Sequence, residues 1–575
     1  MKVGHHGQKK LMHKIISFTF FNLLCISAIW SQIDSLQYGS PVGWPIQLSG
    51  TFGELRPGHF HMGIDIKSPN GGTGHDILSI ADGYVSRIQI SSGGYGRVLH
   101  IVHPTGHESV YAHLNAFTPE IDQYVKDVQY QNESFELDLM LFPDQFEVKK
   151  GQKIGEMGMT GRTFGPHLHF EIRDKWTELG LNPLLLGIPV NDTEAPRFYQ
   201  IKVYEYDNNF REIHTQELKI KSNGKGYTTA PSRITVHSDF IAIGVKAYDR
   251  MNGVRNLNGV FSFDMNVDGQ PIFSCDFDTL SYRQQRYINA HKDFSAFVSK
   301  DAYVNRMCIL PGNQLDIYSS NEQSGIIRVG DDQTKAIEIV VSDHYKNQRT
   351  IRFELLKEND PPEYSTTVFN HHIQHNTPST FKLGELTVHF DKGHVYQDVY
   401  AKITSSLHDS LQQKIYHIHE RSEPVHRPFQ ISLHLPEIPD SIRPQTFISG
   451  INSRGDQANY GGRWEGDTLT TMLYSFGDFT VALDTIAPTI EVKSFEYDLQ
   501  DAKAMSFTIK DQFPRARLTY EARVDGQWIL MDYDAKKDRL THYFDDRINP
   551  GKHKMTLRVS DRKGNDTEWQ GEFIR

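Results

Sequence analysis

The chain has 575 residues but only three cysteines, and its Lys plus Arg (61) and Asp plus Glu (71) nearly balance, for a formal net charge of −10. A charge this small, without a block of one sign, does not indicate a surface for nucleic acid or another polyanion. The hydrophobic fraction of 38% and the aromatic fraction of 11% are too high for a disordered chain. We therefore expect several folded domains.

Long apolar runs are also scarce. The one such run, Ile15–Trp30, closely follows Lys9, Lys10 and Lys14. This layout is typical of a secretory signal peptide, expected here over residues 1–31, with an uncleaved anchor as the alternative. After cleavage no transmembrane span remains, so we expect an exported protein. In an oxidising compartment Cys275 and Cys308 either form a disulfide or remain two buried thiols.

Three short segments that combine Asp with Pro divide the rest of the chain, at Asp192–Pro196, Asn359–Pro362 and Asp484–Pro488. Each precedes a run of alternating apolar and polar residues, which is typical of strands with one solvated face. The sequence therefore predicts a mainly β protein with a first domain at 33–190, a β-sandwich module at 195–357, a β-rich module at 363–483 and an immunoglobulin-like β-sandwich module at 486–575.

One short motif recurs in these modules. Val341–Asn347 reads VSDHYKN, Val559–Asn565 reads VSDRKGN, and Ala247–Gly253 is a looser version. A strand that ends in Asp and runs into an Asn- or Gly-containing hairpin resembles the last hairpin of immunoglobulin-like sandwiches in bacterial surface proteins. The motif therefore favours immunoglobulin-like modules after the first domain.

The residues suited to chemistry lie in the first domain. The stretch His167–Ile172 alternates polar and apolar residues, so on a strand His167 and His169 point to the same face. Two adjacent imidazoles above a buried sheet are unfavourable if both are charged, and useful if a metal ion holds one of them neutral.

A second pair of candidate ligands precedes this strand. His61 and Asp65 are separated by Met-Gly-Ile, and Gly63 allows the tight turn that brings an imidazole and a carboxylate together. With His169 they would supply two nitrogens and one oxygen. Three protein ligands and an open fourth position are typical of a catalytic zinc site rather than a structural one.

The order of the motifs is more specific than any one of them. H-x-G-x-D at His61, Y-A-H-L at Tyr111 and G-x-x-x-G-P-H-L-H-F-E at Gly161 follow one another, with turn-rich segments between. Together they closely resemble the lysostaphin/LytM-type zinc metalloendopeptidases over Gly53–Arg173. The resemblance implies a small antiparallel β domain of the duplicated-hybrid-motif type, with a narrow groove over the metal, and a peptide bond of peptidoglycan as substrate.

The resemblance also implies roles for individual residues. His61, Asp65 and His169 would bind Zn²⁺. His113 and His167 would be the catalytic histidines that flank the attacking water, one taking its proton and the other hydrogen-bonding the oxyanion; which does which stays open. A further residue, Tyr95, lies in a glycine-flanked loop and is a candidate for substrate binding in the groove.

The chain departs from the common family pattern after His113, where about thirty residues, Asn115–Phe146, intervene before the next family motif. Within them Pro119–Gln129 has its apolar residues at helical spacing. We expect a helical insertion that narrows or covers the groove and so affects substrate selectivity.

The expected function is therefore that of an exported zinc metalloendopeptidase acting on peptidoglycan, in the periplasm or cell envelope of a bacterium. The alternatives are a non-catalytic envelope protein that binds cell wall or activates an amidase, and an adhesion protein. Because the five chemical residues all precede the first Asp/Pro segment, a chain ending near Pro189 is expected to be catalytically complete. The modules would then act as spacers or bind an envelope partner.

Overall fold

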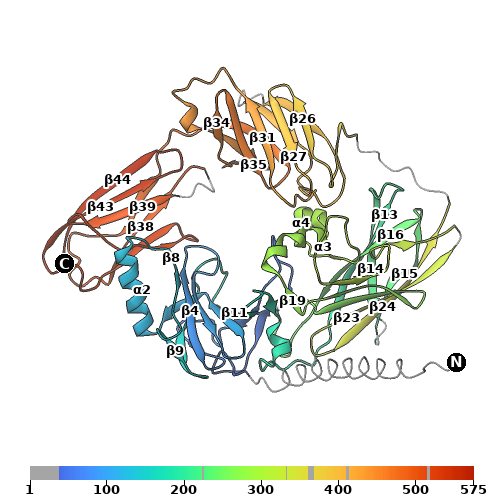
Figure 1. Ribbon diagram of the computed structural model, residues 1–575, viewed down its shortest axis with the longest axis horizontal. Coiled ribbons are helices and arrows are strands. Elements are labelled where there is room, and N and C mark those ends of the chain that lie inside the picture. The colour runs from blue at the N-terminus through green and yellow to red at the C-terminus, as the bar shows by residue number, and fades with distance from the viewer. Residues whose placement is uncertain are drawn as a thin grey trace, which may run out of the picture.

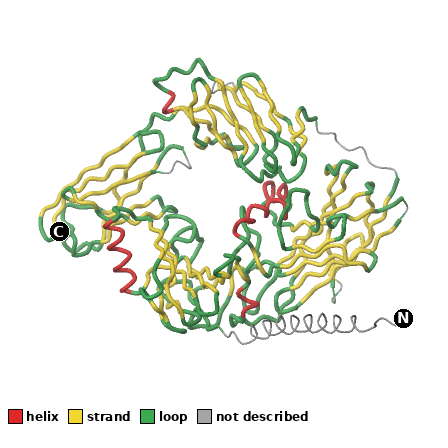
Figure 2. Tube along the Cα trace, viewed as in Figure 1, coloured by secondary structure: helices red, strands yellow, loops and turns green. Residues whose placement is uncertain are grey.

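The computed structural model describes residues 38–222, 224, 226–331, 333–359, 368–408, 413–513 and 518–575, and the expected signal peptide lies outside them. The described chain is mainly β, as expected, and its parts follow one another around a ring (Figure 1) in which strands greatly exceed helices (Figure 2). None of the helices in the described ranges has both the length and the hydropathy to cross a membrane.

The first part contains an antiparallel sheet and a small second sheet on one shared core. The large sheet has the order β1 (Leu48–Gly50), β2 (Ile64–Lys67), β11 (His167–Asp174), β6 (His107–Ala112), β5 (Arg97–Val102), β4 (Gly83–Ile90) and β8 (Leu137–Met140), with β9 (Glu147–Val148) beside β4 and β12 (Gly180–Leu181) beside β11. The small sheet has the order β3 (Asp76–Leu78), β10 (Lys153–Met157) and β7 (Leu114–Phe117).

Strand β11 positions the site at the centre of the large sheet. Its apolar residues Leu168, Phe170 and Ile172 are all buried in the core beneath it, so the alternation predicted from the sequence is confirmed. In the register of β11 with β2, His169 lies directly opposite Asp65. Directly opposed residues on neighbouring strands have their Cβ atoms about 5 Å apart, and this pairing brings the imidazole and the carboxylate together.

The second part is one large twisted sheet with three short helices at its edge (Figure 1). The sheet has the order β20 (Asn305–Arg306), β16 (Phe240–Tyr248), β13 (Arg197–Tyr206), β14 (Glu212–Ser222), β15 (Tyr227–Val236), β24 (Gln348–Lys357), β23 (Thr334–Ser342), β17 (Ser262–Val267), β18 (Gln270–Asp276) and β21 (Tyr318–Ser320), and β22 (Ile327–Arg328) pairs with β16. The helices are η2 (Tyr282–Tyr287), α3 (Ile288–His291) and α4 (Phe294–Lys300).

The third and fourth parts are each built from two antiparallel sheets around one core. The third contains β26 (Ser379–Leu383), β27 (Leu386–Phe390), β31 (Phe429–His434), β35 (Thr468–Leu473) and β34 (Arg463–Glu465), opposite β29 (Ile403–His408), β30 (Gln413–Ile418), β36 (Gly477–Leu483), β32 (Thr446–Ile451) and β33 (Gln457–Asn459), with β25 (His371–Ile373) and β28 (Val399–Ala401) at the side. The fourth contains β37 (Thr489–Ser494), β38 (Ala504–Lys510), β42 (Arg539–Tyr543) and β41 (Asp532–Asp534), opposite β40 (Gln527–Trp528), β39 (Thr519–Val524), β43 (Lys552–Ser560) and β44 (Asp566–Ile574).

The first and second parts are not independent, which differs from the expected catalytic unit that ends near Pro189. Phe52, Phe60 and Met62 of the first part are buried in the core of the second. In addition, β12 pairs with β19 (Thr279–Leu280), so one sheet continues across the boundary. The Asp/Pro linker between the two parts does not indicate a shared core, because the composition of a linker does not depend on which side chains the flanking parts bury.

The fourth part closes the ring by contacting the helical insertion. The expected helix is present as α2 (Pro119–Gln131). Tyr130 of α2 packs edge-on against Trp528 with ring centroids 5.3 Å apart. The guanidinium carbon of Arg547 lies 4.4 Å from the centroid of the same Tyr130 ring. Lys126 forms an ion pair with Asp545. The insertion therefore serves as a docking element for the C-terminal part.

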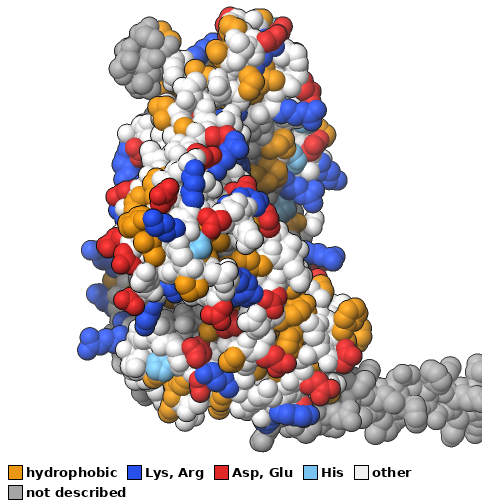
Figure 3. All heavy atoms as spheres, turned by 90° about the vertical axis from the view of Figure 1, so that its left-hand side faces the viewer, with side chains coloured by type: hydrophobic (Ala, Val, Ile, Leu, Met, Phe, Trp, Pro, Cys, Tyr) orange, Lys and Arg blue, Asp and Glu red, His pale blue; other side chains and the backbone are white. Residues whose placement is uncertain are grey.

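The face that carries this contact mixes basic and acidic side chains (Figure 3). Opposite charges are interspersed there rather than gathered into a patch of one sign. This agrees with the small net charge of the sequence. On this face nothing favours a polyanionic ligand.

The two cysteines of the described chain are both buried and free. Cys275 lies in β18 within the main core of the second part, and Cys308 lies in a smaller cluster beside Tyr204 and Tyr206. Of the two alternatives left by the sequence, the structure contains the pair of buried thiols.

Candidate metal centre

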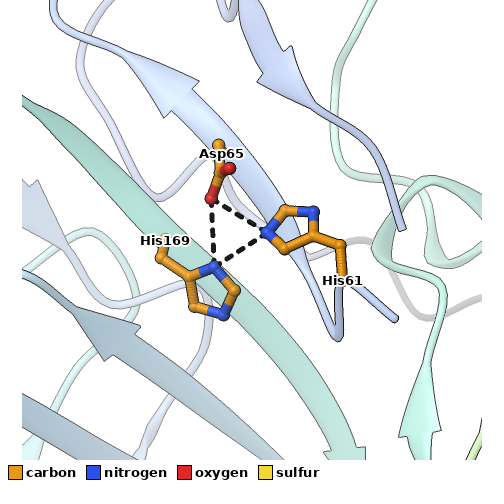
Figure 4. A group of neighbouring side chains, drawn as sticks. All are labelled: His61, Asp65 and His169. Atoms are coloured by element: carbon orange, nitrogen blue, oxygen red, sulfur yellow. Dashed lines mark hydrogen bonds and ion pairs between the residues drawn. The ribbon is translucent and has the colours of Figure 1, made fainter. Parts of the chain in front are cut away.

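His61, Asp65 and His169 converge on one point (Figure 4). Nε2 of His61 lies 3.0 Å from Oδ1 of Asp65 and 3.0 Å from Nδ1 of His169, and the same Asp65 oxygen lies 3.0 Å from Nδ1 of His169. All three side chains are buried. Three atoms with lone pairs are thus held within hydrogen-bond distance of one another in a dry environment.

Hydrogen bonds behind the two imidazoles set their protonation. Nδ1 of His61 donates to the carbonyl oxygen of Thr51 at 2.8 Å. Nε2 of His169 donates to Oε1 of the fully buried Glu171 at 2.8 Å. When each ring is neutral its proton lies on the far nitrogen, so that Nε2 of His61 and Nδ1 of His169 then face the centre with free lone pairs, the arrangement seen behind metal-binding histidines.

Asp65 is held as a carboxylate. Burial alone would raise its pKa, but the neighbouring His61 and His169 side chains hold the pKa of Asp65 well below its ordinary value. Its second oxygen, Oδ2, accepts a hydrogen bond from Arg56 at 2.9 Å. The oxygen that faces the two histidines therefore carries negative charge and has no proton of its own.

These residues fit a zinc ion. Zinc binds imidazole nitrogens and carboxylate oxygens at about 2.0–2.2 Å, so atoms on one ion lie at most about 4 Å apart. The three facing atoms meet that limit, since each pair is separated by 3.0 Å. Two facing nitrogens without a proton between them repel unless a cation lies there. The two imidazole nitrogens and one carboxylate oxygen are thus a donor set that fits a zinc ion.

His113 and His167 lie beside the three ligands, with their ring centroids 4.9 Å apart. Nδ1 of His113 donates to the Thr160 carbonyl oxygen, and Nδ1 of His167 donates to the Gly165 carbonyl oxygen, both at 2.9 Å. Each ring therefore presents an unprotonated Nε2 when neutral. Burial, with the charges of the neighbouring His169 and His167, lowers the pKa of His113 to about 3.

The backbone conformation at His113 also helps to orient its side chain. Its φ of 62° lies in the left-handed region, uncommon for residues other than glycine. This conformation occurs where the chain turns from β6 into β7, and the amide of His113 donates to the Tyr95 carbonyl oxygen at 2.9 Å. Strain of this kind persists where the surroundings fix the residue for a purpose.

Tyr95 lies behind a ligand. Its ring stacks on His169 with centroids 4.9 Å apart, and its hydroxyl donates to Oε1 of Glu171 at 2.5 Å. The hydroxyl is therefore engaged with the carboxylate that orients His169. Its role in substrate binding, expected from the sequence, remains a prediction.

The second part of the chain supports all three ligands, a feature that the sequence analysis missed. Tyr282 of η2 donates to Oε2 of Glu171, the acceptor behind His169. The amide of Gly259 donates to Glu54 at 3.1 Å, and Glu54 pairs with Arg56, the donor to Asp65. No sequence signal indicated these contacts, because the residues lie in a part without a recognisable motif.

Thr51, the acceptor behind His61, is tied to the same place, since its hydroxyl donates to the Gly259 carbonyl oxygen at 3.0 Å. A cavity of about 440 Å³ opens next to it, lined from both parts by residues that include Arg56, Phe164 and Tyr248. The Phe164 side chain is fully solvent-exposed. The cavity is lined by Arg56, the residue that donates to Asp65, and by apolar side chains of both parts.

Two other histidines near the motifs, His100 and His103, make contacts elsewhere. His100 pairs with Glu108 at 3.1 Å, and His103 bonds to the Asp82 carbonyl oxygen and to Ser109. These rings serve strand packing rather than the centre.

Comparison with known proteins agrees with this site. The model of peptidase family M23 matches residues 59–130 and 137–183, and that of the Zu5-like domain matches 370–484. The DD-carboxypeptidase/endopeptidase Mpg of Neisseria meningitidis serogroup B is 32% identical over 144 residues, 25% of this chain and 26% of that protein. The murein hydrolase activator NlpD of Escherichia coli is 36% identical over 143 residues, 24% of this chain and 30% of that protein.

Among solved structures, the catalytic domain of the prophage-encoded M23 protein EnpA from Enterococcus faecalis is 26% identical and covers 25% of this chain and 95% of that domain, with a TM-score of 0.19. The chain matches only about a quarter to a third of the length of the curated relatives. The similarity to peptidase family M23 is thus confined to residues 59–130 and 137–183, the segment that carries the candidate metal centre. The relatives include both an endopeptidase and an activator of other hydrolases.

Proposed function

We propose that the protein is an exported zinc metalloendopeptidase that hydrolyses peptide bonds in the cross-links or stems of peptidoglycan. The observation that carries the proposal is the complete set of five residues in one place. His61, Asp65 and His169 converge with free lone pairs, and His113 and His167 lie beside them. A domain that only binds cell wall has no need for all five.

Zinc bound by the three ligands would supply Lewis acidity, which polarises a carbonyl and makes water a nucleophile near neutral pH. Residues of the protein itself accept and donate the protons of the reaction. Because Thr160 and Gly165 hold the Nδ1 protons of His113 and His167, each ring offers Nε2 to the site. One ring takes the proton of the attacking water and delivers it to the leaving amine, while the other, once protonated, hydrogen-bonds the developing oxyanion.

The supporting residues keep this geometry fixed. Glu171, bonded to Tyr95, Tyr282 and Arg173, orients His169 and increases its basicity as a ligand. Arg56 limits rotation of Asp65 by holding its outer oxygen. The hydrogen bonds of His61 and His169 favour the tautomers that a bound metal would require.

The expected place of action is the periplasm or cell envelope of a bacterium. The support is the N-terminal sequence pattern together with the relatives, one named a DD-carboxypeptidase/endopeptidase and the other a murein hydrolase activator. Peptidoglycan is the proposed substrate for the same reason. An envelope protein bound through the C-terminal modules remains a proposed partner.

The experiment that tests the proposal uses the purified, zinc-loaded protein and intact cell walls. We expect release of peptide fragments, identified by mass spectrometry, whose ends define the bond cut. H167A and H61A serve as inactive controls, and chelation followed by zinc addition should abolish and restore release.

The relative that activates murein hydrolases defines the second candidate, a non-catalytic activator. It predicts that the protein alone releases nothing, but that it increases fragment release by an added amidase. H167A should then activate as well as the unaltered protein does, since proton transfer would play no part. Release by the protein alone would exclude this candidate.

A further inference from the structure

Two groups of three aspartates occupy equivalent positions in the second and fourth parts. Each group takes one Asp from the linker that enters the part, one from the end of a strand, and one from the recurring V-S-D motif. Within each group one carboxylate oxygen of every member lies within 4.8 Å of the others. The first group is Asp192, Asp249 and Asp343, and the second is Asp484, Asp511 and Asp561.

The hydrogen bonds around the two groups repeat atom for atom. Asp343 accepts from the amide and the side chain of Asn347, and Asn347 Nδ2 also lies 3.4 Å from the Asp192 carbonyl oxygen. Asp561 accepts in the same way from Asn565, whose Nδ2 lies 3.2 Å from the carbonyl oxygen of Asp484. Two modules of one chain thus use the same side chains to bring three carboxylates together.

The first group is deeply buried and incompletely satisfied. Asp192, Asp249 and Asp343 are 7%, 1% and 2% exposed. Oδ2 of Asp192 and Oδ1 of Asp249 have no hydrogen-bond partner, and within the described ranges no Lys, Arg or His forms an ion pair with these carboxylates. Burial and the two neighbouring carboxylates raise the pKa of Asp249 to about 8. Buried acceptors without a partner are unfavourable, and repelling ones more so.

We propose that each group binds one calcium ion. Calcium takes only oxygen ligands, at about 2.3–2.6 Å, so oxygens on one ion lie at most about 5 Å apart. The three converging carboxylates meet that limit. The unpartnered oxygens of Asp192 and Asp249 become ligands, and the cation offsets the repulsion. Zinc, which favours nitrogen and sulfur ligands, is disfavoured because neither group contains His or Cys.

A cation in the first group joins the linker at Asp192 to the ends of two strands, since Asp249 follows β16 and Asp343 follows β23. It therefore fixes the second part, which carries Tyr282, relative to the metal centre. A cation in the second group does the same between the third and fourth parts. The positive charge of Lys563 acts on Asp484 and partly offsets the negative charge of the second group. The second group should therefore bind calcium more weakly than the first.

Calcium binding to the full chain is the direct test. The protein is freed of divalent ions, reloaded with zinc, and titrated with calcium while bound calcium and the thermal midpoint Tm are measured. We expect two calcium ions per chain. A hundredfold excess over Kd should raise Tm by about 5–10 °C.

Variants make the assignment specific. D249N should bind one calcium ion, D249N/D511N none, and the control D144N, at an exposed position, should bind two. In the absence of calcium D249N should be at least as stable as the unaltered protein, because an amide removes the repulsion between carboxylates. If Asp249 only supported the fold, D249N would be less stable than the unaltered protein. No bound calcium at about 10 mM, above the range used by extracellular modules, or normal binding by folded D249N, would overturn the proposal.

Discussion

Tyr282 and Glu171 are 111 positions apart in sequence, yet the tyrosine hydroxyl donates directly to the carboxylate that orients the ligand His169. Glu171 is fully buried and also accepts from Tyr95 and Arg173. The second part of the chain is therefore built into the support of the metal centre. It acts on the ligand His169 through Glu171.

From this contact we predict that Y282F weakens zinc binding or activity about 10- to 100-fold, the usual effect of losing a residue that orients a ligand. The ring remains, so packing should be preserved. Zinc affinity by competition with a chelating dye checks the prediction. Y287F is the matched control, because Tyr287 ends the same helix but bonds to Gln314; equal affinities of both variants would contradict a positioning role for Tyr282.

The family resemblance carried by three sequence motifs was sufficient to name the five central residues, which the structure brings together. It was insufficient for Tyr282 and Arg56. These reach the centre through packing between distant segments, which leaves no periodic signal. The alternation in β11 predicted the buried face correctly, whereas Phe52 and Phe60 gave no indication that they belong to the core of the next part. The recurring V-S-D motif indicated a hairpin and did not reveal its carboxylate cluster.

The ligand and proton-transfer roles predict different losses. H61A and H169A should lose zinc, since two protein ligands do not complete a catalytic site. H113A and H167A should keep zinc but lose about 10²- to 10⁴-fold in turnover, the usual contribution of a positioned acid or base. Zinc content by mass spectrometry and fragment release are measured on the same samples. H100A, which alters a histidine bound to Glu108, should resemble the unaltered protein in both.

Asp249 predicts a pH dependence of stability without calcium. Its pKa is raised to about 8 in the folded protein, by burial and then by Asp192 and Asp343, against about 3.9 when unfolded. Between these values the folded state holds the extra proton, so this group makes stability fall as pH rises from about 4 to 8. Tm against pH should fall less steeply in D249N. Parallel curves for D249N and the unaltered protein would contradict the shift.

Docking of the fourth part on α2 predicts local protection. Lys536 donates to the Met159 carbonyl oxygen at 2.6 Å, next to the Thr160 carbonyl that holds His113. W528A removes the ring that packs on Tyr130, so amides of α2 should exchange hydrogen faster while the sheets remain protected. W464A, in the third part, is the control. Unchanged exchange in W528A would show that the ring is not closed in solution.

The shared core predicts the behaviour of a truncated chain. A protein ending near Pro189 exposes Phe52, Phe60 and Met62, and each large apolar side chain contributes about 1.5–3 kcal/mol when buried. It also loses Tyr282 and the Gly259 contacts behind the ligands. We therefore expect it to aggregate or to bind zinc poorly, whereas a chain ending at Asn359 retains the site. Zinc content and light scattering of the two proteins decide the matter: a soluble, zinc-loaded short chain that cuts small wall peptides would restore the view, drawn from the sequence, that the modules are spacers.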